Sequence, residues 1–176
     1  GIDKTDENAI NAVLDKVEIT IRYEDGAQQV ILNGRDVSGK IRTEAVGNAA
    51  SVVSAYRAVR QALLALQQNL AKTSNVIMDG RDIGTCVLPN AQTKIYLTAS
   101  SHVRAVRRYK ELTEKGQMCN LEEIEQDIID RDYRDMHREN SPLKQADDAV
   151  LLDSSDMTLK EVVDTIAAMI DKKQGA

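Results

Sequence analysis

The sequence contains no tryptophan and no phenylalanine, and five tyrosines are its only aromatic residues. Proteins that hold single-stranded nucleic acid commonly stack the bases on such rings, so this composition argues against that function. The 23 Lys and Arg residues are outnumbered by 28 Asp and Glu, which gives a net charge of −5. General nucleic-acid binders usually present a basic face. We therefore expect no nucleic-acid polymer as a partner.

Long apolar runs are also missing. No stretch approaches the roughly 20 apolar residues that a membrane-spanning helix needs, and no signal-peptide pattern opens the sequence. Cys86 and Cys119 lie far apart and form no C-x-x-C pair, which is typical of free thiols in a reducing compartment. The length favours one domain with at most a small insert. We expect a cytoplasmic protein with no membrane partner.

Arginine, by contrast, is clustered, mainly within residues 104–108 and 131–138. The guanidinium group is a planar fork of N–H donors that matches phosphate and carboxylate oxygens. Local arginine clusters in an acidic protein therefore point to small anionic ligands.

The first part of the chain has two kinds of periodicity. A helix is expected from Thr5, with an apolar face formed by Ile10, Val13, Leu14 and Val17. From Glu18 the period changes to two, and "EITIRY", "EDGAQ" and "QVILNG" predict a hairpin, followed by a third short strand around Val37. Thr43 is the expected cap of the next helix, and a break near Tyr56 leads to a further helix.

The later part alternates strands with helices. Short apolar runs that end in polar residues predict buried parallel strands at 75–79, 93–99 and 149–153. Helices are expected over 101–114, from Leu121 through "RDYRDMHREN", and after a capping box of Thr158 and Glu161. The last helix should bury Leu159, Val162, Val163, Ile166 and Ile170. The alternation predicts an α/β layered domain with a parallel sheet, into which residues 17–70 are inserted.

The stretch "DGRDIG" begins where the first of these strands should end. Ligands of open parallel sheets bind beyond the carboxyl ends of the strands. Gly80 would allow a sharp turn there, and Arg81 and Asp82 would reach into the crevice, as a phosphate fork and a hydrogen-bond acceptor. The spacing leaves two interpretations open, because Arg81 and Asp82 could equally pair with each other at a strand end.

A second candidate group lies in "RDYRDMHR". On a helix Arg131, Asp135 and Arg138 share one face, whereas Arg134 points away from it toward solvent. Two guanidiniums beside a carboxylate suit a ligand that carries both a phosphate and a hydroxyl. A bare charge run, however, is more often a solvated helix surface laced with salt bridges.

The remaining candidates are weaker. Arg104, Arg107 and Arg108 form a basic stripe that could simply balance the acidic residues Glu122, Glu123 and Glu125. The second "GRD" stretch, "NGRDVSG", is typical of a turn, because Asn-Gly favours positive φ angles. His102 and His137 have no partners at metal-ligand or triad spacing and are expected at the surface.

Together, these segments resemble the bacterial cytidylate kinases, of the nucleoside monophosphate kinase group. The resemblance is carried by "NGRDVSGKIRTEAVGNAAS", "VRQAL", "DGRDIGT", "KIYLTAS", "RAVRR" and "RDYRDMHRENSPL", which run in the family's order over nearly the whole chain. It implies a P-loop kinase fold with a core of residues 1–16 and 71–176, a CMP-binding insert at 17–70 and a lid at about 109–140. The lid would be drawn from the helix pair of residues 101–138.

The resemblance also implies an activity, namely transfer of the γ-phosphoryl of ATP, with Mg²⁺, to CMP or dCMP by a monomer. Residue by residue, it implies cytosine contacts for Ser51, Arg60 and Asp82, and a sugar-hydroxyl contact for Asp135. Arg81, Arg131 and Arg138 would hold the CMP phosphate and carry the catalysis, and Arg107 would meet the ATP phosphates.

One departure from the family concerns the ATP side. The family opens with a strand and a G-x-x-x-x-G-K-S/T loop that cradles the ATP phosphates, and these 176 residues contain no such motif. The strand before that loop would lie between those of "VIMD" and "KIYL". We therefore expect the 176 residues alone to be inactive and unstable, with a CMP-binding module without catalytic power as the alternative function.

Overall fold

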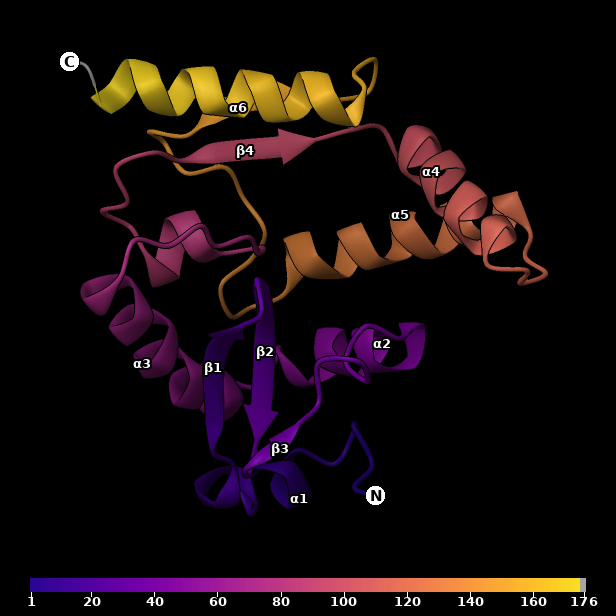
Figure 1. The fold of residues 1–176 in the computed structure, drawn as a ribbon. Coiled ribbons are helices and arrows are strands. Elements are labelled where there is room, and N and C mark those ends of the chain that lie inside the picture. Colours follow the sequence, from indigo (N-terminus) through magenta and orange to yellow (C-terminus); the bar gives the residue numbers. More distant parts are fainter. Residues whose placement is uncertain (175–176) are drawn as a thin grey trace. The chain divides into compact units, whose positions relative to one another are not determined.

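The computed structural model describes residues 1–174 and divides the chain into two compact units, which meet in sequence between Asn75 and Val76. Figure 1 shows the elements in chain order, from indigo to yellow. The expected α/β class with a parallel sheet is confirmed. Each unit is described by itself.

The first unit opens with a shorter helix than the sequence predicts. Helix α1 covers Glu7–Asn11, and a 3-10 turn at Leu14–Lys16 follows. The cap is Asp6, which accepts a hydrogen bond from the Ala9 amide at 3.0 Å, while the hydroxyl of Thr5 donates to Asp3 at 2.8 Å. The expected helix from Thr5 to Val17 is therefore wrong at both ends, because Asp6 provides the stronger cap and the backbone tightens after Ala12.

A three-stranded antiparallel sheet follows, as the period of two predicts. Strands β1 (Ile19–Glu24) and β2 (Ala27–Leu32) pair with Ile19 opposite Leu32, and β3 (Arg35–Asp36) adds to β2. Both turns are Asx-Gly pairs with positive φ, at 53° and 76° for Asp25 and Gly26 and at 48° and 76° for Asn33 and Gly34. The interpretation of "NGRDVSG" as a turn is confirmed, since this backbone matches the twist of the strands.

Two helices complete the first unit. Helix α2 (Glu44–Val53) begins where the Thr43 hydroxyl accepts a hydrogen bond from the Val46 amide, at 3.4 Å. Helix α3 (Arg57–Thr73) starts after the expected break at Tyr56 and buries Val59.

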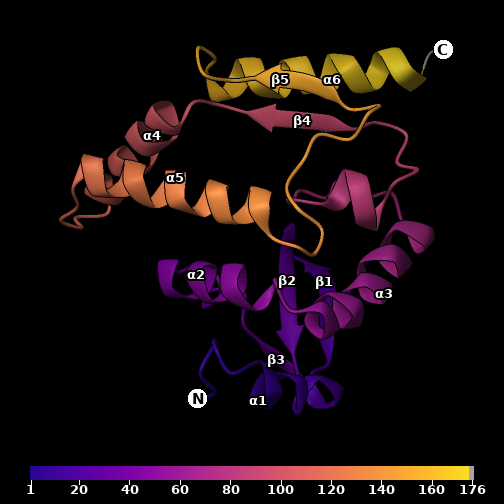
Figure 2. The ribbon, with the colours of Figure 1, turned by 180° about the vertical axis from the view of Figure 1, so that it is seen from behind.

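The second unit has a parallel pair of strands flanked by helices. Strands β4 (Ile95–Thr98) and β5 (Val150–Asp153) pair in register, with Ile95 beside Val150. Helices α4 (Ser101–Glu114) and α5 (Leu121–His137) pack side by side, and α6 (Leu159–Gln174) runs along the two strands (Figures 1 and 2). The core of this unit includes Ala105, which is fully buried on α4, and Leu152 on β5.

Residues 75–79 do not form the strand that the sequence predicts. The segment has no regular secondary structure, and the Ile77 side chain is 95 % exposed. A strand is stable only when its backbone groups pair with a neighbour, and within residues 1–174 the parallel sheet consists of β4 and β5 alone. The apolar run pairs with neither of these two strands.

The buried face of α6 also differs from expectation. Leu159 and Val163 are exposed, at 81 % and 55 %, whereas Val162, Ile166 and Ile170 are partly buried. A two-stranded sheet is too narrow to cover the whole apolar stripe of a helix, so one edge of the stripe faces outward. The capping box is confirmed, because the Thr158 amide and hydroxyl donate to Glu161 at 2.8 and 2.7 Å.

Candidate functional site

The "DGRDIG" stretch enters the second unit through a turn that needs glycine. A Cβ atom on Gly80 would lie 2.9 Å from Cγ1 of Ile83, closer than side chains tolerate. Asp82 follows, is 9 % exposed, and stands at the start of a single π-helical turn, Ile83–Val87. This tight path sets Arg81 and the largely buried Asp82 on successive positions of a fixed backbone.

Arg81 pairs with a carboxylate far along the chain. Its Nε donates to Oδ2 of Asp135 at 3.1 Å, and Asp135 lies on α5 with only 4 % of its surface exposed. Arg81 therefore pairs with Asp135 and not with its neighbour Asp82, so the interpretation that these two neighbours merely pair with each other is wrong. Instead, two of the sequence's candidate groups, "DGRDIG" and "RDYRDMHR", meet at Asp135.

Arg131 is the third member of this cluster, which we call the Arg81–Asp135–Arg131 cluster. Its Nε lies 3.8 Å from Oδ2 of Asp135, one helical turn along α5. That nitrogen is buried and has no hydrogen-bond partner. An unmet buried N–H is costly, so it favours any ligand that brings an acceptor to it.

The electrostatics of the cluster are positive overall. Burial lowers the pKa of Arg131, the charge of Arg81 lowers it further, and Asp135 and Asp132 oppose both effects. A guanidinium nevertheless keeps its proton at neutral pH. One carboxylate therefore faces two guanidinium charges, and this excess suits a phosphate.

Arg138 caps the helix that carries Arg131 and Asp135, and its amide still donates to the Arg134 carbonyl at 3.0 Å. Helix α5 ends at His137, and Arg138 has an extended backbone with φ −66° and ψ 144°. Its Nε and Nη2 donate to the Ser141 carbonyl at 2.9 and 2.7 Å. The chain then turns back, and the Leu143 amide donates to the Asp135 carbonyl at 2.8 Å. Arg134 is exposed, as expected.

The basic stripe on α4 contains three arginines in three different situations. Arg104 donates to the Ala99 carbonyl through Nε at 3.0 Å. Its Nη1 and Nη2 donate to the two carboxylate oxygens of Asp132 on α5. Arg107 donates through Nη2 to the carbonyls of Ser154 and Met157, at 2.6 and 3.1 Å. Arg108 pairs with Glu111 on its own helix at 2.9 Å.

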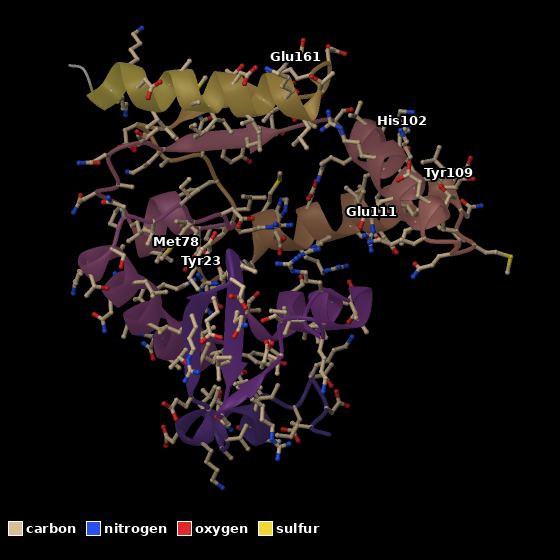
Figure 3. The ribbon with its side chains drawn as sticks, viewed as in Figure 1. Tyr23, Met78, His102, Tyr109, Glu111 and Glu161 are labelled. Atoms are coloured by element: carbon tan, nitrogen blue, oxygen red, sulfur yellow. The ribbon has the colours of Figure 1, made fainter. Side chains whose placement is uncertain are left out.

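The expected balance between this stripe and the acidic start of α5 is therefore wrong in its partners. Glu125 instead pairs with Nδ1 of His102 at 2.8 Å. Figure 3 labels His102 on α4. Both histidines, His102 and His137, are exposed, as the sequence predicts. The sequence did not indicate a role for Asp132, because its partner Arg104 lies on another helix.

Lys94 is a further buried charged residue, and no motif or spacing in the sequence predicts its burial. Its side chain is 7 % exposed, and Nζ contacts Asp148 at 2.8 Å as well as the Pro89 carbonyl. The stem of Lys94 also packs against Gly84 in the π-helical turn. This lysine therefore fastens the segment after Asp82 to the start of β4.

Ser51 and Arg60 belong to the first unit. The Ser51 carbonyl accepts from the Ser54 hydroxyl at 3.1 Å, and Nη1 of Arg60 donates to the Ser54 carbonyl at 3.3 Å. Both residues are partly buried at the junction of α2 and α3. Their contacts with a ligand stay predictions.

Residues 1–174 offer neither a cluster of metal ligands nor a membrane-spanning helix. No group of three or more His, Cys, Asp and Glu side chains there is arranged to hold a metal ion. No helix in that range is both long and apolar enough to cross a bilayer. Neither Cys86 nor Cys119 takes part in a disulfide within this range.

Comparison with known proteins places these features in a family. Residues 1–172 match the family described as cytidylate kinase. A cytidylate kinase of Lactobacillus johnsonii is 50 % identical over 174 residues, covering 99 % of this chain and 76 % of the relative. The cytidylate kinase of Bacillus licheniformis is 45 % identical, covering 98 % and 77 %. Cytidylate kinase 1 of Haemophilus influenzae is 46 % identical, covering 97 % and 74 %.

The match spans nearly every described element, including the segments that hold Arg81, Arg131 and Asp135. The chain belongs to the cytidylate kinase family of nucleoside monophosphate kinases.

Proposed function

We propose that the protein to which this chain belongs transfers the γ-phosphoryl of ATP to CMP or dCMP, giving CDP or dCDP. The observation that carries the proposal is the Arg81–Asp135–Arg131 cluster, in which a single buried carboxylate faces two guanidiniums and one buried N–H is unmet. A nucleoside monophosphate supplies both missing parts, because its phosphate brings negative charge and acceptor oxygens.

Within this proposal Arg81, Arg131 and Arg138 hold the CMP phosphate. Both arginine contacts of Asp135 fall on Oδ2, which leaves Oδ1 to accept from a sugar hydroxyl. Ser51, Arg60 and Asp82 contact the cytosine edge. A phosphate oxygen is already an anionic nucleophile, so the arginines act by positioning and by offsetting charge, and no general base is needed.

The 176 residues provide fewer candidate groups for binding ATP than for binding CMP. Mg²⁺ would arrive with ATP, since this ion is usually held by one or two carboxylates together with substrate phosphates and water. Arg107 would meet the ATP phosphates by exchanging its present carbonyl partners. The proposal also includes a kinase core of residues 1–16 and 71–176, a CMP-binding insert at 17–70 and a lid at about 109–140. It further includes a monomeric state and a cytoplasmic location.

A second candidate function is a CMP-binding module without catalytic power. It is favoured by one observation, the lack of a G-x-x-x-x-G-K-S/T motif in the 176 residues. The two functions share the CMP site and differ only in turnover.

The test compares two arginines three positions apart on α5. Arg131→Gln should lower kcat/KM for CMP about a hundredfold, because a charged donor aimed at the phosphate is lost. Arg134→Gln is the matched control, since Arg134 is exposed, and should stay close to the unsubstituted protein. Equal behaviour of the two variants, in the protein as its gene encodes it, would remove the cluster from the proposed site.

A further inference from the structure

Arg104 connects the end of a strand to the helix that bears the phosphate cluster. It lies in the first turn of α4, four residues after the cap Ser100. Its Nε donates to the carbonyl of Ala99, at the end of β4, at 3.0 Å. Its two terminal nitrogens meet the two carboxylate oxygens of Asp132 on α5. One side chain thus joins three elements, β4, α4 and α5.

This contact is built to fix orientation. A two-pronged arginine–carboxylate pair restricts rotation as well as distance, unlike a single lysine contact. The Arg104 side chain is 36 % exposed and that of Asp132 21 %, so water screens the pair only in part. The third contact, to the carbonyl of Ala99 just after β4, connects the fork to the sheet.

Asp132 occupies a particular place on α5. It follows Arg131 directly and precedes Asp135 by less than one turn, so any rotation of α5 about its axis at Asp132 carries both cluster residues with it. Its charge also raises the pKa of Arg131 against the effect of burial. The fork with Arg104 therefore acts on the same turn of helix that presents the phosphate-holding groups.

Other polar contacts of α4 do not have this reach. The pair Arg108–Glu111 stays within α4. His102 meets Glu125, nearly two turns of α5 before Asp132, with 64 % of the His102 side chain exposed. Neither contact touches the turn of α5 that contains Arg131.

We propose that Arg104 is a positioning residue of the acceptor site, which through its fork with Asp132 holds Arg131 and Asp135 where they meet the phosphate of the bound nucleotide. This inference rests on the proposed function, because it takes the ligand of the cluster to be a nucleoside monophosphate. Arg104 itself touches no substrate in this assignment.

The experiment measures how strongly the protein prefers CMP over cytidine, which lacks the phosphate. Dissociation constants for both ligands are obtained by calorimetry, with cytidine by displacement, on the protein as its gene encodes it. Arg104→Gln should weaken CMP about tenfold and cytidine by much less, since misplacing the arginines affects the phosphate contacts first. Arg108→Gln, a neighbouring arginine paired only within its own helix, is the control and should keep both constants.

A double-mutant cycle with Asp132→Asn identifies the partner. If the fork carries the effect, the double variant Arg104→Gln/Asp132→Asn should lose little more CMP affinity than the worse single variant. Additive losses would show that Arg104 acts through something else and would overturn the proposal. If Arg104→Gln is unfolded by circular dichroism, Arg104→Lys takes its place, and the same fall in the CMP-to-cytidine preference is expected because lysine cannot form the fork.

Two further results would also overturn the inference. An equal loss for CMP and cytidine would mean that Arg104 supports the fold in general, and an unchanged preference would mean that the fork is dispensable. A failure of the proposed function looks different, because the unsubstituted protein would then bind CMP no better than cytidine.

Discussion

At the scale of single residues, the charge of Asp135 decides whether the two arginines of the cluster can stay together. Arg81 and Arg131 both lie within 4 Å of Oδ2 of Asp135 and would repel each other without this carboxylate between them. Asp135 is 4 % exposed, whereas both arginine side chains keep about two fifths of their surface in water. The repulsion is therefore partly screened, and its cost is below that of a fully buried triad.

Asp135→Asn should consequently lower the free energy of unfolding by about 2 kcal/mol, through loss of the charge with little change of volume. Urea unfolding monitored by circular dichroism measures the effect. Asp130→Asn is the matched control, because Asp130 is exposed on the same helix and meets only Gln126 at 2.8 Å. If both variants unfold at the same urea concentration, the charge of Asp135 is not a stabilising part of the cluster.

The sequence predicted which residues belong to this cluster better than it predicted which of them contact each other. Residue type and helical spacing bring Arg131 beside Asp135, and that was confirmed. The contact with Arg81 depends on tertiary packing, which no local spacing contains. The spacing did not show that α5 ends at His137 or that the Arg138 side chain donates to the Ser141 carbonyl, because both depend on the turn that follows the helix. The fork of Arg104 with Asp132 joins two helices and could not be read from either one.

At the scale of elements, local chemistry made the most reliable predictions. Asx-Gly turns set the hairpin, and Thr43 and Thr158 mark helix starts, because each acts on residues within a few positions of the chain. The strand at 75–79 and the outer edge of α6 failed for a common reason. The parallel sheet of residues 1–174 has only two strands, so residues 75–79 lie outside it and one edge of α6 is uncovered, and apolar side chains of both stay exposed.

The capping box of α6 gives a prediction about pH. The Thr158 amide and hydroxyl both donate to Glu161 and hold the pKa of that carboxyl below its usual range. Because this pKa is lower in the folded than in the unfolded protein, the carboxylate stabilises the fold fully at pH values above its unfolded-state pKa of about 4.3. The stabilisation is lost as the pH falls through the folded-state pKa. Acid should therefore weaken the start of α6.

Glu161→Gln should be less stable than the unsubstituted protein at pH 7, and the difference should shrink steadily as the pH is lowered from about 5 to 3. Thermal unfolding at a series of pH values measures this difference. The difference is the quantity to follow because other exposed carboxyls with lowered pKa, Asp3, Asp36, Glu111, Asp148 and Asp153, titrate in the same window. A gap that stays constant with pH would contradict the role of the carboxylate.

At the scale of the whole molecule, the second unit leaves much apolar surface uncovered. Leu97, Val150 and Leu151 on its two strands are exposed, as are Leu159 and Val163 on α6. Two paired strands also leave backbone groups open at both edges. Surface of this kind is usually covered in a functional protein, and the chain spans about three quarters of the length of its relatives.

A polypeptide of these 176 residues alone should therefore bind CMP but show no ATP-dependent formation of CDP. Its residues include the Arg81–Asp135–Arg131 cluster, which needs only the acceptor nucleotide, and they contain no G-x-x-x-x-G-K-S/T loop to cradle the ATP phosphates. Calorimetry with CMP and a coupled assay for CDP separate the two properties, and Arg131→Gln controls for binding at the cluster. Turnover that depends on both ATP and CMP would show that the chain holds ATP without such a loop and would contradict the prediction.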